Sequence, residues 1–344
     1  TNIPIHDPRT YQLLARGDVQ GVFQVEGTGM RNLMMQMKPT RFQHIVAALS
    51  LFRPGPMEYI PTYIRRMHGE EAVQYRHPDL APALGETYGI IVYQEQIMRV
   101  ARDIAGYSVG EADTIRKAVA KKNAEQLLKH KTKFREGAVK KGYPAELADD
   151  IFGDIEYFAR YGFPKAHAAD YAAITCQTAW LKAVYPLEYI CAFLTCESGN
   201  TEKITALIAD ARQHGIEILP PSINASDADF TIEEAPPAAG NGAHKRGIGR
   251  IRFGLMAIKG VGEGPVHAIV AARRQGGRFK SLDDFCRRVD MAALNKRALE
   301  ALIKAGAFDE FGSRAQLLAV VDQMIGVATT VRKAAERGQG MLFG

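Results

Sequence analysis

The chain has 344 residues, of which 47% are hydrophobic and 24% charged, and its 44 basic and 38 acidic side chains give a formal charge of +6. These proportions are ordinary for a soluble globular protein, and at about 150 residues per domain the length predicts two or more packed units. No apolar run approaches the roughly 20 residues that span a bilayer, and the four cysteines show no CxxC spacing, which argues against a membrane protein, a disulfide framework and a zinc site.

The first residues lack the basic and apolar segments of a secretory signal peptide. They also lack an initiator methionine, so we expect the chain to begin inside a longer protein. Cysteines without a disulfide pattern are typical of a reducing compartment. A cytoplasmic location is therefore predicted.

Helical patterns dominate the middle of the chain. Residues 111–141 are rich in Ala, Lys, Glu and Leu and contain no proline, which favours one helix, and Gly142 and Pro144 end it. The next segment, 145–161, carries apolar side chains at helical spacing: Leu147, Ile151, Ile155 and Phe158. Further helices are predicted at 166–184, 187–196 and 201–214.

Prolines and glycines divide these helices. The sequence Phe-Arg-Pro-Gly-Pro at 52–56 cannot continue a helix. A short strand is predicted at 216–218, before Pro220 and Pro221. Residues 231–249 contain further prolines and glycines and are predicted to be a linker loop, after which 250–255 alternates as a strand. The expected fold is mainly α, with a short β element.

A glycine-rich turn lies between two predicted helices at 258–270. Glycines there let the backbone approach a phosphate, and the amide groups at the start of the second helix can donate to it. This pattern is typical of a helix-hairpin-helix, which binds the duplex backbone without reading sequence. A dinucleotide fingerprint fits less well, because residue 265 is proline and no second parallel strand follows. A glycine turn without a ligand remains open.

Two further clusters carry positive charge. Arg116 and Lys117 precede Lys121, and residues 117 and 121 share a helical face, where like charges repel unless an anion lies between them. Lys165 and His167 lie close to a predicted helix N-terminus, which favours an anion. A triphosphate would suit both clusters, while a solvated helix face is the alternative for each.

Taken together, the chain closely resembles the alpha subunits of bacterial DNA polymerase III, the C-family of replicative DNA polymerases. The matching stretches occur in the family's order across almost the whole chain: 21–26, 52–56, 88–96, 112–113, 116–117, 121–122, 161–171, 200–203, 258–264 and 294–297. This common order is far more specific than any one motif.

The resemblance implies a division of the chain and a set of binding residues. The expected parts are an exit from the palm domain (1–30), a helical fingers domain (31–230), the linker (231–249), a helix-hairpin-helix region (250–312) and a C-terminal helix with a tail (313–344). The incoming dNTP would contact Arg116, Lys117, Lys121 and Lys165 through its triphosphate and His167 through its sugar. The primer–template duplex would contact Lys259, Gly260, Val261, Gly262, Gly264 and Arg273.

The tail resembles the short peptide by which replicases bind the β sliding clamp. Met341, Leu342 and Phe343 can fill an apolar pocket, while Gln339 anchors the polar end. The chain departs from the family's usual residues at Pro164, Ala166 and Asp170, and it has Lys117 where arginine is commoner. Lys165 and the tail favour the replicative branch of the family over error-prone relatives, which usually carry an acidic residue at the position of Lys165.

Catalysis in the family needs Mg²⁺ held by palm carboxylates, which the resemblance places before Thr1. We therefore expect this chain to be part of a DNA-directed DNA polymerase, to meet other replicase subunits, to bind no metal and to be inactive alone. Two other interpretations remain, a stand-alone helix-hairpin-helix DNA-binding protein and a clamp-binding adaptor.

Overall fold

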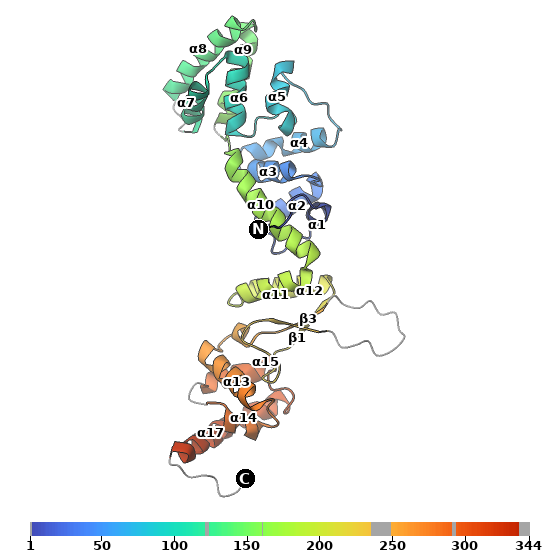
Figure 1. The fold of residues 1–344 in the computed structure, drawn as a ribbon, viewed down its shortest axis with the longest axis vertical. Coiled ribbons are helices and arrows are strands. Elements are labelled where there is room, and N and C mark those ends of the chain that lie inside the picture. The colour runs from blue at the N-terminus through green and yellow to red at the C-terminus, as the bar shows by residue number, and fades with distance from the viewer. Residues whose placement is uncertain (1, 121–123, 160, 235–248, 291–293, 337–344) are drawn as a thin grey trace, which may run out of the picture. The chain divides into compact units, whose positions relative to one another are not determined.

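The computed structural model of the chain describes residues 2–120, 124–159, 161–234, 249–290 and 294–336. The described residues are mainly helical, as predicted, with one small sheet (Figure 1). None of the described helices is long and apolar enough to cross a membrane. The chain divides into two compact units, 1–184 and 185–344, which are described one at a time.

The first unit consists of ten α-helices among its described residues. They are α1 (Pro8–Ala15), α2 (Thr28–Met37), α3 (Phe42–Leu51), α4 (Ile60–Met67), α5 (Ala81–Leu84), α6 (Gln94–Ala105), α7 (Val109–Ala120), α8 (Ala124–Lys140), α9 (Ala145–Ala159) and α10 (Lys165–Val184). Short 3-10 helices at Pro56–Tyr59, Pro78–Leu80 and Gly85–Thr87 join some of them.

Helix α10 forms because its sequence is rich in alanine, the strongest helix former. Its buried positions include Ala168, Ala172, Cys176 and Ala179, which lie on one face at helical spacing. Their small side chains let α10 pack closely against α3 and α1 in one hydrophobic core. The predicted helix at 166–184 is therefore confirmed.

The single helix predicted at 111–141 is wrong, because the structure has α7 and α8 there instead. Ile115 of α7 and Phe134 of α8 are buried in the same core, with α6 packed against both helices. Nineteen residues of one straight helix would hold these two side chains about 28 Å apart. Because both side chains are buried in one core, this segment forms two helices and not one.

The second unit begins with a small sheet and the helices α11 (Pro186–Cys196) and α12 (Thr201–Gln213). Strand β1 (Ile216–Leu219) pairs in parallel with β3 (Gly249–Arg252), and β2 (Thr231–Glu233) pairs antiparallel with β3, in the order β1-β3-β2. Ile216 and Ile251 are buried with Leu194 and Leu207 of the helices. The strand β2 occupies the start of the segment predicted as linker, of which 235–248 lie outside the described residues.

The rest of the second unit is a helical core. It contains α13 (Glu263–Gly276), α14 (Leu282–Arg288), α15 (Lys296–Ala305), α16 (Arg314–Ala319) and α17 (Val321–Glu336), after a 3-10 turn at Leu255–Ala257. Strand β3 ends at Arg252, three residues before the end of the strand predicted at 250–255. Phe279, Phe285 and Phe308 lie at the centre of this core, with ring centroids 5.1 and 4.9 Å apart in sequence order. These edge-to-face contacts hold the helices that carry the glycine turn.

Candidate nucleotide and DNA-binding sites

The start of α10 is attached to the start of α6. Phe163 and Tyr93 form an isolated parallel bridge, in which the Gln94 amide donates to the Phe163 carbonyl at 3.0 Å and the Phe163 amide donates to the Val92 carbonyl at 3.3 Å. The Gln94 side chain also donates to the Gly162 carbonyl at 3.0 Å. The first turn of α10, with Lys165 and His167, is thus held against the N-terminus of α6.

Lys165 and His167 both lie in the first turn of α10. The Lys165 Nζ atom is 2.6 Å from a carboxylate oxygen of Glu86. The exposed His167 ring lies near the rings of Phe163 and Tyr171, with centroid distances of 5.6 and 4.4 Å and inclinations of 51° and 57°. An aromatic row beside a cation can contact the flat and anionic parts of a nucleotide at once.

The Phe-Arg-Pro-Gly-Pro segment contacts the residues just before α10, a role that its sequence did not indicate. The Arg53 guanidinium lies 4.4 Å from the centre of the Phe163 ring and donates to the carbonyls of Ser50 and Tyr161. Burial lowers the pKa of Arg53. Gly55 has a φ of +99°, and a side chain there would meet the Tyr161 ring at 2.5 Å, so this motif requires glycine.

The second cationic cluster lies on α7. Arg116 and Lys117 both contact Asp113, at 2.7 Å each, and their side chains are 33% and 61% exposed. Hydrogen bonds from Lys117 and then Arg116 lower the pKa of Asp113. Asp113 thus pairs with both cations, and their contact with a triphosphate stays a prediction. Lys121 lies outside the described residues.

A cavity of about 460 Å³ lies elsewhere in the first unit. Arg66, Arg76, Leu84, Ile91 and Phe158 are among the residues that line it. None of the four described cationic or histidine side chains predicted to bind the nucleotide lines it. The predicted nucleotide contacts therefore do not lie in this cavity.

The glycine turn in the second unit has the predicted form of a short turn into a helix. Gly260 has a φ of +92°, Val261 is buried and its amide donates to the Ile258 carbonyl at 3.0 Å, and Gly262 is the N-cap of α13. Gly264 lies in the first turn of α13, and Lys259 is exposed beside the turn. The first amide groups of α13 thus start at an exposed glycine turn, the geometry that receives a phosphate.

Two arginines of the second unit have positions that the sequence did not reveal: Arg273 is mostly buried, and Arg297 lies near the glycine turn. The Arg273 side chain, 14% exposed, donates to the carbonyls of Ile223 and Ser226 at 3.1 and 2.5 Å and to Asp227 at 2.6 Å. These contacts hold α13 against the turn before β2. A contact of Arg273 with DNA stays a prediction. The exposed Arg297 of α15, to which the sequence assigned no role, has its Nε 4.0 Å from where a Cβ on Gly260 would lie.

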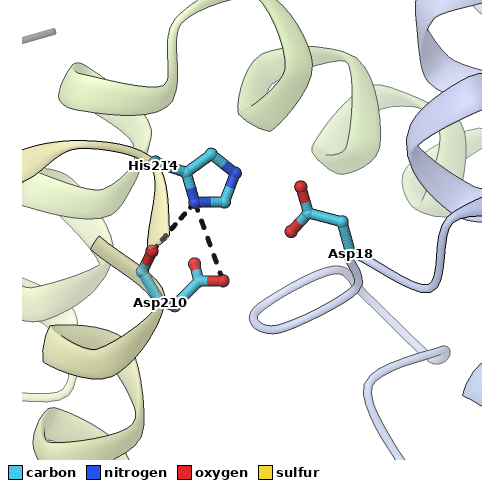
Figure 2. Close-up of side chains that lie close together, drawn as sticks. All are labelled: Asp18, Asp210 and His214. Carbon is cyan, nitrogen blue, oxygen red and sulfur yellow. Dashed lines mark hydrogen bonds and ion pairs between the residues drawn. The ribbon is translucent and has the colours of Figure 1, made fainter. Parts of the chain in front are cut away.

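One histidine–carboxylate group lies at the end of α12, and the predicted clamp-binding tail lies outside the described residues. His214 follows α12, and its Nδ1 lies 2.9 Å from the Asp210 carbonyl and 3.9 Å from the Asp210 carboxylate (Figure 2). Within the first unit, Asp18 is paired with the buried Lys182 at 2.8 Å. The predicted clamp-binding residues Gln339, Met341, Leu342 and Phe343 lie outside the described residues.

Two family models match this chain. Residues 1–142 match the finger domain of the bacterial DNA polymerase III alpha subunit, and residues 215–317 match a helix-hairpin-helix motif. The first match includes α7 with Arg116 and Lys117, and the second includes the glycine turn before α13. The order of the two matches is the order predicted from the sequence.

Three curated relatives carry the same description. The DNA polymerase III subunit alpha of Thermus aquaticus is 47% identical over 99% of this chain, that of Deinococcus radiodurans 45% over 100%, and that of Neisseria meningitidis serogroup B 46% over 99%. The chain spans 27%, 25% and 28% of their respective lengths. With both models matched in order and such identity along practically its whole length, the chain belongs to the family of bacterial DNA polymerase III alpha subunits.

Proposed function

We propose that this chain is the part of a replicative DNA-directed DNA polymerase that holds the incoming nucleotide and the primer–template duplex. The observation that carries the proposal is the finger-domain match over residues 1–142, because a stand-alone helix-hairpin-helix protein or a clamp adaptor would leave those residues without a role. The curated relatives named as alpha subunits support the same assignment.

The nucleotide would bind at the cations of the first unit. Arg116, Lys117, Lys121 and Lys165 bind the triphosphate in this proposal, and His167 lies beside the sugar. Arg116 and Lys117 already share one anionic partner, Asp113, which supports their contacting one phosphate group. Charge-assisted contacts of this kind are among the strong hydrogen bonds of proteins.

The duplex would bind at the glycine turn of the second unit. The backbone amides that follow Gly262 donate to a phosphate in this proposal, with Lys259 and Arg297 near the turn. Such contacts position a protein on DNA without reading its sequence. A replicase needs this property, since it must move over every sequence.

Chemistry would need the rest of the intact enzyme. Palm carboxylates would hold Mg²⁺ there, which would supply activation of the primer hydroxyl and stabilisation of the leaving group's charge, and we assign those carboxylates to the part of the relatives that this chain does not span. Residues 1–344 alone are accordingly proposed to bind substrates without extending a primer. Primer extension by the purified chain would contradict this.

The nucleotide assignment can be tested in an enzyme that includes the palm. Arg116→Gln together with Lys117→Gln removes two positive charges and should raise the KM for dNTP about a hundredfold, at roughly 1.5 kcal/mol or more per contact. Lys129→Gln, which breaks another helical ion pair at 2.7 Å, is the matched control. An unchanged KM in the double variant would refute the assignment.

The tail is proposed to bind the β sliding clamp, alongside the contacts that other replicase subunits make. Leu342→Ala with Phe343→Ala removes the apolar anchors and should abolish clamp binding in a titration with purified clamp. The affinity for duplex DNA should stay as it is. Undiminished clamp affinity of this variant would reject the tail assignment.

A further inference from the structure

Both groups of Lys165 that could bind an anion already have a carboxylate. Its ammonium lies 2.6 Å from Glu86, and its backbone amide donates to the two oxygens of Glu95 at 3.1 and 3.0 Å. A triphosphate reaching the first turn of α10 therefore meets two carboxylates before it meets the lysine. Replacing a close counter-ion favours ligands that carry several negative charges.

Glu86 itself is held on one side only. Its Oε2 atom contacts Lys165, while its Oε1 atom is buried and has no hydrogen-bond partner among the described residues. Native proteins rarely leave a buried polar atom unpaired, and each such atom points to a second arrangement or an exchangeable partner. The Glu86 carboxylate is thus not fixed by a complete set of contacts.

The first unit has two further buried hydroxyls without a hydrogen bond to any residue that the structure describes. The hydroxyls of Tyr63 and Tyr93 also lack partners among the described residues, and the two side chains are 0% and 1% exposed. Burial first, and the neighbouring Glu86 carboxylate as a further cause, raise the pKa of both phenols. Each hydroxyl therefore keeps its proton.

We propose that Glu86 is the resting counter-ion of Lys165, which holds the ammonium while the site is empty and competes with the triphosphate for it. On nucleotide binding the triphosphate takes the place of this carboxylate at the ammonium. This inference rests on the proposed function, in which Lys165 contacts the triphosphate. It adds a specificity element, because a ligand of low charge cannot displace Glu86.

The test is Glu86→Gln in the 344-residue chain, with two measurements whose changes should have opposite signs. Loss of the partly exposed ion pair should lower the thermal midpoint of the unliganded chain by about 1–3 °C. Loss of the competing charge should tighten binding of dATP with Mg²⁺ by roughly three- to tenfold in calorimetric titration. If Glu86 had a purely structural role, Glu86→Gln would lower the thermal midpoint and would also weaken dATP binding, since the variant would then only loosen the site.

Lys165→Gln separates this inference from the proposed function. If that variant binds dATP as the unsubstituted chain does, or if the unsubstituted chain binds none, the proposed function fails and this inference with it. If Lys165→Gln weakens binding while Glu86→Gln leaves it unchanged or weaker, the counter-ion role alone is overturned.

Two further variants complete the experiment. In a chain that already carries Lys165→Gln, Glu86→Gln should no longer tighten binding, and a persistent gain would contradict competition for the lysine. Glu125→Gln is the matched control, because Glu125 is also paired with a lysine at 2.7 Å but lies on α8. It should leave dATP binding unaltered; a gain equal to that of Glu86→Gln would reduce the effect to net charge and overturn the proposal.

Discussion

The two candidate phosphate sites hold their cations in different ways. On α7 and at the start of α10, Arg116 and Lys117 share Asp113, and Lys165 is paired with Glu86. Beside the glycine turn, Lys259 and Arg297 are exposed and make no ion pair with any residue that the structure describes. The cations of the first unit thus already have carboxylate partners, whereas those of the second present their charge to solvent.

This difference teaches what each site would demand of its ligand. A ligand of the first unit must replace a bound carboxylate, so that its own charge decides whether it binds. A ligand of the second unit displaces only salt ions, and the release of counter-ions from DNA then contributes to binding in proportion to the phosphates contacted. We expect salt to weaken the second interaction strongly, which suits a contact that must hold and release many phosphates in turn.

The largest expected effect concerns the exposed pair. Lys259→Gln with Arg297→Gln should weaken duplex binding at least tenfold and reduce the slope of log affinity against log salt by roughly two, at about 0.9 per phosphate. Fluorescence anisotropy at several salt concentrations measures both. Lys304→Gln, which removes a cation paired with Glu300 at 3.3 Å, should leave the slope as it is. An equal loss in that control would erase the distinction between paired and exposed cations.

A second prediction concerns the backbone of the turn. Gly260 has a φ of +92°, and a Cβ there would meet nothing nearer than Ala301 at 3.8 Å, so Gly260→Ala costs strain of about 1 kcal/mol without a clash. Gly264→Ala is the matched control, because that glycine is helical with open space around it, and alanine should stabilise it by about 0.5–1 kcal/mol. Urea unfolding measures both variants, and equal stabilities would show that the turn imposes no special backbone conformation.

The smallest effect concerns acid. Hydrogen bonds from Lys117 and Arg116 lower the pKa of Asp113 below its ordinary value of 3.8. The unfolded chain therefore binds the proton more readily, and the stability from this carboxylate is present above pH 3.8 and is lost as the pH falls toward the lowered pKa. In Asp113→Asn the midpoint of urea unfolding should change less between pH 5 and pH 3. Identical pH dependence in both proteins would mean that Asp113 does not hold these cations.

Much of the fold follows from local patterns. The helices at 166–184, 187–196 and 201–214 and the strand at 216–218 were predicted and are confirmed with small shifts of their ends, because alanine-rich runs, apolar spacing and prolines act over a few residues. The helix at 111–141 was mispredicted because nothing local opposes helix there. Its division depends on Ile115 and Phe134 sharing one core.

The sequence singled out the charged side chains of the candidate sites. It did not predict which residues contact them in the folded chain. The sequence singled out Lys165 and the glycine turn, since helix starts and glycines have local signatures. It did not reveal that Glu86, 79 residues away, contacts Lys165, that Arg273 is held inside the unit, or that Arg297 lies beside Gly260. Each of these contacts joins segments far apart in the chain.

By itself, the sequence determined the family and the helical class, and it singled out the side chains that we propose to bind phosphates. Composition, periodicity and motif order are properties of neighbouring residues, and they survive without a folded chain. Only the tertiary structure decided which cations are neutralised and which are exposed, because an ion pair depends on distances of a few ångströms between side chains that packing brings together. The same packing left the Oε1 atom of Glu86 buried without a hydrogen-bond partner among the described residues, which no local pattern predicts.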